Sequence, residues 1–237
     1  MLIKGLQKIT MLDYPGKIAC TIFVFGCNFR CPYCHNEELV LAEEAKKLKT
    51  YSEKEVLNFL KKRKKFLEGT CITGGEPTLY PELLDFIKKI KKLGYLIKLD
   101  TNGTNPAMLK KLLRGKLVDY VAMDFKAPFE KYEQIVNAKV DLDKIKESID
   151  IIKKFPDYEF RITIVPEQLE KKDLLEIAKF LKEKKANKAF YLQQFRNDKC
   201  LDKEFEKKSN FPLEKLKEYK KVLEPYFQGV EIRTEIY

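Results

Sequence analysis

The chain has 237 residues, 44% of them hydrophobic, which is enough to fill the core of one large α/β domain. Its net charge of +11 arises from lysines mixed with glutamates on the polar faces of predicted helices, so we favour a solvated surface over a nucleic-acid groove. The apolar run at residues 18–25 is too short to span a membrane, and no signal-peptide cleavage pattern follows it. We therefore expect a cytoplasmic protein.

Apolar, β-branched runs alternate with amphipathic segments along the chain, a pattern typical of repeated strand and helix units. The predicted strands lie at residues 18–25, 70–73, 95–99, 117–123, 159–165 and 188–192. The intervening segments carry helix signals. Ser52 to Glu55 is a capping box, and Gly94 ends the segment that begins near Pro81.

Six strand and helix units predict a parallel sheet, because parallel neighbours need a crossover helix that covers the sheet. Eight units would close a TIM barrel, whereas six leave it open or partial. We therefore expect a single domain over residues 1–237 with the fold of a partial (β/α)6 TIM barrel. A C-terminal helix near residues 213–224 and a short strand within GVEIRTEIY, residues 229–237, should follow. Ligands of such folds bind where the strands end.

The first predicted strand ends in a loop that contains Cys27, Cys31 and Cys34. Six cysteines in a chain of this size do not suggest a disulfide framework, and soft thiolates suit zinc or an iron–sulfur cluster. A zinc site would need a fourth ligand, and His35, the only histidine, stands directly beside Cys34, where joint chelation is awkward. Three thiolates on a four-iron cluster would leave one iron free to bind another molecule.

The C-x3-C-x2-C spacing, with aromatic Tyr33 before the last cysteine, resembles the cluster loop of the radical S-adenosylmethionine (SAM) enzymes. The resemblance implies that Cys27, Cys31 and Cys34 hold a 4Fe-4S cluster whose unique iron chelates the amino and carboxylate groups of SAM. It also implies that Tyr33, Cys34 and His35 lie beside that cofactor.

The segment TGGEP, residues 73–77, follows the second predicted strand. Its glycines let the backbone approach a ligand closely, and the lack of a Lys-Ser/Thr pair argues against a phosphate loop. It resembles the GGE motif of the same family, which holds the methionine amine of SAM. The resemblance implies that Gly74, Gly75 and the Glu76 carboxylate bind the cofactor.

Polar residues also follow the third, fourth and fifth predicted strands, and by alternation alone they are equally well explained as ordinary loop-facing side chains. DTNG and D-x-K, however, resemble the SAM and monovalent-cation motifs of glycyl-radical activating enzymes. The resemblance implies a cation bound by Asp100, Thr101 and Asp124. The other residues expected at the cofactor are Asp100, Asn102, Asp124, Phe125, Lys126, Arg161 and Gln194, with Gln193 as the alternative to the last.

Two further segments resemble one branch of the family. CPYCHN, residues 31–36, and the lead-in LDYPG, residues 12–16, are similar to the activating enzymes of pyruvate formate-lyase and of anaerobic ribonucleotide reductase. The resemblance implies an oxidoreductase that cleaves SAM reductively to a 5′-deoxyadenosyl radical and takes hydrogen from a glycine of a partner enzyme. A flavodoxin or ferredoxin would supply the electron.

Two other functions stay open at this point. A radical SAM enzyme that acts on a small molecule or RNA, such as 7-carboxy-7-deazaguanine synthase, has a similar size and partial barrel, and the basic charge would suit an anionic substrate. A zinc-binding scaffold with a basic face for nucleic acid would use the same cysteines without catalysis.

Overall fold

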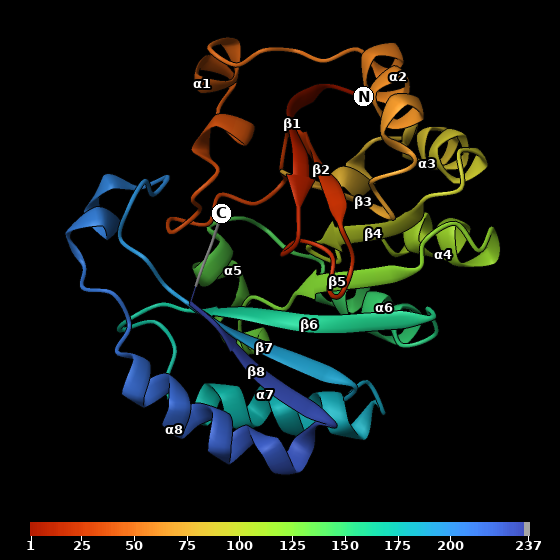
Figure 1. Cartoon of the computed structure of the whole chain (residues 1–237). Coiled ribbons are helices and arrows are strands. Elements are labelled where there is room, and N and C mark those ends of the chain that lie inside the picture. The colour runs from red at the N-terminus through yellow and green to blue at the C-terminus, as the bar shows by residue number, and fades with distance from the viewer. Residues whose placement is uncertain (235–237) are drawn as a thin grey trace.

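Eight strands form one open sheet in the computed structural model, which describes residues 1–234. They lie side by side in chain order from β1 to β8 (Figure 1). The strands are β1 (Ile3–Thr10), β2 (Ala19–Val24), β3 (Gly69–Gly74), β4 (Leu96–Thr101), β5 (Tyr120–Asp124), β6 (Asp157–Ile164), β7 (Ala189–Gln194) and β8 (Gly229–Arg233). All neighbours from β2 to β8 pair in parallel. The predicted α/β fold with an open sheet is confirmed.

Helices connect the parallel strands, and the longer of them pack on one face of the sheet (Figure 1). They are α1 (Ala42–Lys46), α2 (Glu53–Arg63), α3 (Leu83–Lys92), α4 (Pro106–Arg114), α5 (Tyr132–Val136), α6 (Leu142–Ile152), α7 (Lys171–Glu183) and α8 (Leu213–Leu223). None of the helices within residues 1–234 is long and apolar enough to cross a membrane. Of the predicted final strand, the part up to Arg233 is β8, and residues 235–237 lie outside the described residues.

The predicted helix signals have the expected geometry. The Ser52 hydroxyl accepts a hydrogen bond from the Glu55 backbone at 3.2 Å, and the Glu55 carboxylate accepts one from the Ser52 backbone at 2.7 Å, which is a complete capping box at the start of α2. Helix α3 is followed by Gly94 at φ +83°, a left-handed conformation that glycine adopts without steric cost. Local sequence therefore fixes these helix ends.

Strand β1 is the strand that the sequence analysis did not predict. It pairs antiparallel with β2 at one edge of the sheet. Its sequence, IKGLQKIT, includes lysine and glutamine, and only its first and last residues, Ile3 and Thr10, are buried. An edge strand with this mixture of side chains gives a weak periodic signal, because packing on its neighbour rather than composition stabilises it.

Alternate residues of each strand point to opposite faces of the sheet. The outer face packs against the helices and is apolar, with members that include Ile22, Ile72, Ile97, Leu99, Val121, Phe160, Ile162 and Leu192. The inner face carries polar and charged residues that line a cavity, among them Lys98, Asp100, Asp124, Arg161, Thr163 and Gln193. The position of a residue on one face or the other therefore decides its chemical role.

Candidate active site at the carboxyl ends of the strands

A cavity of about 490 Å³ lies at the carboxyl ends of the strands and extends along the inner face of the sheet. This volume falls in the range of ordinary cofactor and substrate pockets. Of the residues predicted to form the site, those that line it are Cys27, Cys31, Tyr33, Cys34, His35, Gly74, Gly75, Asp100, Thr101, Asn102, Asp124, Lys126 and Arg161. The parallel sheet brings these residues together because it places the ends of all its strands at one edge.

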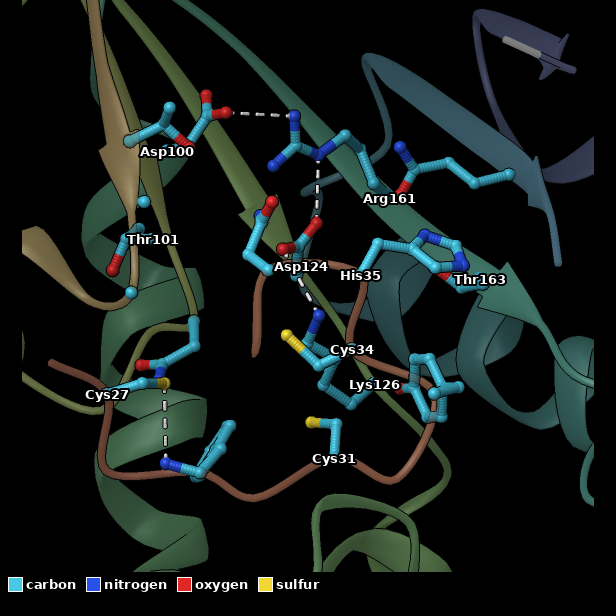
Figure 2. A pocket seen from close by; sticks show the side chains of 18 of the residues that line it. Cys27, Cys31, Cys34, His35, Asp100, Thr101, Asp124, Lys126, Arg161 and Thr163 are labelled. Carbon is cyan, nitrogen blue, oxygen red and sulfur yellow. Dashed lines mark hydrogen bonds and ion pairs between the residues drawn. The ribbon is translucent and has the colours of Figure 1, made fainter. Parts of the chain in front are cut away.

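The three cysteines lie on the loop that follows β2, and their sulfur atoms face a common space (Figure 2). All three are free thiols. Burial raises the pKa of Cys27 to about 11 and that of Cys31 to about 12, so binding of metal must displace the thiol protons. This donor set of soft sulfur ligands fits an iron–sulfur cluster.

Within residues 1–234, no three His, Cys, Asp or Glu side chains are arranged to hold one metal ion together. That arrangement would be needed for a mononuclear zinc site. A cluster has a different requirement, because each thiolate binds a different iron atom and the sulfur atoms stay apart. The geometry of the cysteine loop is therefore compatible with a cluster.

The glycine segment after β3 forms a close-fitting wall of the cavity. A Cβ atom on Gly75 would collide with the carbonyl oxygen of Gly26, and Gly74 has φ +123°. Both positions therefore require glycine, and both line the cavity. Nearby, the buried hydroxyl of Tyr33 has no hydrogen-bond partner among the described residues. A polar ligand in the cavity could satisfy it.

Glu76 hydrogen-bonds to neighbouring loops of the protein. Its side chain is fully buried and does not line the cavity. One carboxylate oxygen accepts hydrogen bonds from the Thr78 backbone at 3.0 Å and the Thr101 hydroxyl at 2.8 Å. The other accepts one from the Asn102 backbone at 2.6 Å. Burial raises the pKa of this carboxyl group, and the hydrogen bonds oppose that rise. The Glu76 carboxylate is thus occupied by donors of the protein itself and does not line the cavity, and its predicted contact with an ammonium group of the ligand stays a prediction.

Two other predicted site residues lie away from the cavity. Phe125 is buried against the rings of Phe129 and Tyr132, with centroids 5.6 and 6.0 Å away. Gln194 points to the outer face and donates a hydrogen bond to the Phe211 carbonyl at 2.6 Å. Gln193 lines the cavity instead. Because side chains alternate along a strand, only one of two adjacent glutamines can face inward.

Five charged residues form a continuous chain of ion pairs on the inner face, which we call the charge ladder, and Figure 2 shows its part from Asp100 to Lys126. Its order is Lys98, Asp100, Arg161, Asp124, Lys126. Arg161 Nη1 lies 3.2 Å from Asp100 and its Nε lies 2.9 Å from Asp124. Lys126 Nζ lies 3.2 Å from the other oxygen of Asp124. Although burial opposes ionisation, Arg161 and Lys126 hold the pKa of Asp124 below its usual value.

The charge ladder occupies the residues that were expected to bind a monovalent cation. Asp100 and Asp124 each contact two basic side chains, and the Thr101 hydroxyl donates to Glu76. A cation bound by these three residues would have to compete with those partners. The cation site stays a prediction.

Several residues of the inner face were missed by the sequence analysis. Lys98 lines the cavity with only 2% of its surface exposed. Glu159 is fully buried, accepts a hydrogen bond from the Tyr120 hydroxyl at 2.6 Å and pairs with Arg233 at 2.6 Å. Lys98 and Glu159 each stand two positions before a predicted site residue on the same strand. The period of two along a strand was therefore a usable signal.

The segment after β7 holds the cysteine loop in place from a distant part of the chain. The Leu201 backbone donates a hydrogen bond to the Cys34 carbonyl at 2.9 Å. The His35 ring contacts the Arg196 carbonyl at 2.9 Å. Cys200, in the same segment, is fully buried. Nothing in the local sequence of the cysteine loop indicates this contact.

Comparison with known proteins gives consistent matches over the region just described. The family model described as the radical SAM superfamily matches residues 21–181. A Methanocaldococcus jannaschii protein with the provisional name glycyl-radical enzyme activating enzyme is 36% identical, over 98% of this chain and 96% of its own. The pyruvate formate-lyase-activating enzyme of Clostridium pasteurianum is 32% identical over 52% of each chain. The 7-carboxy-7-deazaguanine synthase of Neisseria meningitidis is 30% identical over 58% of each chain.

Solved structures share the fold at low sequence identity. SuiB of Streptococcus suis, crystallised with S-adenosylmethionine, superposes with a TM-score of 0.66 at 17% identity, and the match covers 90% of this chain. The matched part is about half of SuiB, 49% of its chain. QueE of Escherichia coli gives a TM-score of 0.60 at 14% identity and covers 99% of this chain and 94% of its own. At these identities the structures support the fold alone.

Proposed function

The chain belongs to the radical SAM superfamily, and on this premise we propose that it activates a glycyl-radical enzyme. The observation that carries the proposal is the relative from M. jannaschii, which matches nearly the full length of both chains and is named for this activity. Members of the superfamily use a 4Fe-4S cluster and SAM, and the enzyme is an oxidoreductase of this type. The alternative of a non-catalytic zinc scaffold is therefore dropped.

The residues of the cavity suit these two cofactors. Cys27, Cys31 and Cys34 would ligate the cluster, and the backbone at Gly74 and Gly75 would approach the methionine end of SAM. Bound there, the cluster and SAM would supply the one-electron radical chemistry needed to take a hydrogen atom from the Cα of a partner glycine. The protein's own task is to hold SAM and to exclude water from the reacting atoms.

The cavity extends to both edges of the open sheet, and this supports a macromolecular substrate. Leu12 and Asp13, from the connection between β1 and β2, line it together with Arg233 and Thr234 at the end of β8. Because β1 and β8 do not pair, the cavity is bounded here by side chains rather than by a continuous sheet. A peptide segment of a partner protein could enter between the two edges.

The finer assignments follow from sequence resemblance. We propose anaerobic ribonucleotide reductase as the partner, because the segment at residues 12–16 resembles that branch of the activating enzymes. A flavodoxin or ferredoxin would donate the electron. The reaction would take place in the cytoplasm.

A second candidate function is the synthesis of 7-carboxy-7-deazaguanine. It is favoured by QueE, whose fold covers nearly all of both chains, and by the N. meningitidis relative. The charge ladder argues against an anionic substrate here, because Lys98, Arg161 and Lys126 are all paired with carboxylates in the described structure. A substrate carboxylate would find few cations without a partner in this part of the cavity.

The test is to reconstitute the cluster anaerobically, reduce it, add SAM and quantify 5′-deoxyadenosine, with Cys31→Ala as the control. We expect production that depends on Cys31. Anaerobic ribonucleotide reductase is then added, and electron paramagnetic resonance (EPR) is used to look for a glycyl radical. A reductase in which the target glycine is replaced by alanine is the matched negative control.

Three outcomes separate the candidates. A glycyl radical that depends on SAM and on Cys31 supports the proposed function. Faster SAM cleavage with GTP-derived intermediates, and none with the protein partner, would support the synthase instead. A loaded cluster that yields no 5′-deoxyadenosine with either addition would contradict both.

A further inference from the structure

Asn102 lies at the point where three loops of the site meet. It follows β4, is only 5% exposed and lines the cavity. Its side-chain nitrogen donates a hydrogen bond to Asn28 Oδ1 at 2.8 Å and lies 3.9 Å from Cys27 Sγ, within hydrogen-bond range for sulfur. Asn102 is therefore the side chain that links the β4 loop to a predicted cluster ligand.

The orientation of the Asn102 amide is fixed by its other contacts. Its oxygen accepts hydrogen bonds from the Thr104 backbone at 3.0 Å and from the Thr104 hydroxyl at 2.7 Å. The Asn28 amide donates to the same hydroxyl at 3.1 Å. Because the oxygen is used in this way, the amide must direct its NH₂ group toward Cys27 and Asn28.

Glu76 holds the backbone of this loop, which explains why a carboxylate is fully buried beside the cavity without lining it. It accepts the hydrogen bond of the Asn102 backbone at 2.6 Å, and its own backbone donates to the Gly26 carbonyl at 2.7 Å. Gly26 immediately precedes Cys27. Glu76 therefore connects the Asn102 backbone to the start of the cysteine loop.

We propose that Asn102 is a positioning residue that donates a hydrogen bond to the Cys27 thiolate when the cluster is bound, with Glu76 holding Asn102 in place. A hydrogen bond to a cluster sulfur is one of the features that set the reduction potential of an iron–sulfur cluster. Reduction adds a negative charge to the cluster, so a donor at the thiolate stabilises the reduced form more than the oxidised form. Asn102 thereby makes the one-electron reduction easier.

The test measures the reduction potential of the reconstituted cluster by a redox titration followed by EPR, without SAM or partner. In Asn102→Ala the ratio of reduced to oxidised cluster at a fixed solution potential should fall about tenfold, which is a shift of about 59 mV for a one-electron couple. Asn102→Asp keeps the size of the side chain and the acceptor for Thr104 but has no NH₂ donor. It should lower the ratio at least as much, because it also adds a negative charge.

Asn105→Ala is the matched control. Asn105 lies on the same loop, donates to the Thr78 carbonyl at 2.6 Å and caps α4 through the Met108 backbone at 3.1 Å, and makes no described contact with Cys27. Its replacement should loosen the loop without changing the potential. The EPR titration reports only molecules that carry a cluster, so a variant that loads poorly can still be measured.

The inference is overturned if both Asn102 variants keep the wild-type potential, or if Asn105→Ala shifts it equally. It rests on the proposed function only through the cluster. If the potential shifts as expected and no glycyl radical forms on the partner, the proposed function fails and the role of Asn102 stands. If the radical forms and the potential is unchanged in the Asn102 variants, the proposed function stands and the role of Asn102 fails.

Discussion

The two faces of the sheet are stabilised by different forces. On β4, Ile97 and Leu99 are fully buried and pack against helices on the outer face. Lys98 and Asp100, their immediate neighbours in the chain, point inward and belong to the charge ladder. Along four consecutive residues of one strand, hydrophobic packing therefore alternates with ion pairing.

This difference predicts which amino-acid substitutions each face of the sheet tolerates. An apolar residue in a packed core interacts with many neighbours, so a change of volume costs free energy in proportion to the space it leaves. A buried charge depends on one or two partners, and removing a partner leaves a charge without compensation. The outer face should therefore respond gradually to substitution, whereas the inner face should respond to the loss of single partners.

The largest expected effect is that of Arg161→Met. Arg161 is 9% exposed and contacts both Asp100 and Asp124, so its loss leaves two largely buried carboxylates with one basic partner each. We expect the free energy of unfolding to fall by about 3–5 kcal/mol, as for other broken buried ion pairs. Urea unfolding of the metal-free, reduced chain measures it.

Two control variants make the Arg161 result specific. Lys46→Met removes one side of an exposed pair with Glu43 and should leave the unfolding midpoint unchanged. Arg161→Lys keeps the charge but cannot bond both carboxylates in the geometry of a guanidinium, and should recover only part of the loss. Equal destabilisation by Lys46→Met and Arg161→Met would mean that the burial of the charge ladder does not increase its contribution to the free energy of unfolding.

A somewhat smaller effect is expected from Leu99→Ala on the outer face. The fully buried side chain leaves a cavity when truncated, and we expect a loss of about 3 kcal/mol in the free energy of unfolding. Leu99→Met nearly conserves the volume and should cost less than about 1.5 kcal/mol. Urea unfolding would again be the measurement. A Leu99→Met variant as unstable as Leu99→Ala would contradict the view that volume governs this face.

The smallest effect is the coupling between two members of the charge ladder. Lys98 and Arg161 share Asp100, so removing both should cost a different amount from the sum of the single losses. We expect a coupling free energy of about 1 kcal/mol in a double-mutant cycle of Lys98→Met and Arg161→Met. The pair of Leu99→Ala with Arg161→Met has no shared partner and serves as the additive reference. Additivity in both cycles would show that the ladder consists of independent pairs.

The sequence by itself determined the features that depend on near neighbours in the chain. The spacing of Cys27, Cys31 and Cys34 indicated the cluster loop, and the capping box at Ser52 indicated the start of α2. Alternation of apolar runs with amphipathic segments indicated the parallel sheet between β2 and β7. These signals are readable because cluster ligation by one loop, helix capping and strand periodicity each involve residues within a few positions of one another.

Only the tertiary structure decided which partner each polar side chain has. Glu76 meets Asn102, Arg161 meets Asp100, and Leu201 meets the cysteine loop, all across separate elements of the chain. A motif names the residue type at a strand end, but whether a carboxylate faces a ligand or braces a neighbouring loop depends on groups that approach from elsewhere. For that reason most of the residues predicted from the sequence line one cavity, whereas Glu76 and Gln194 have their hydrogen-bond partners outside its lining.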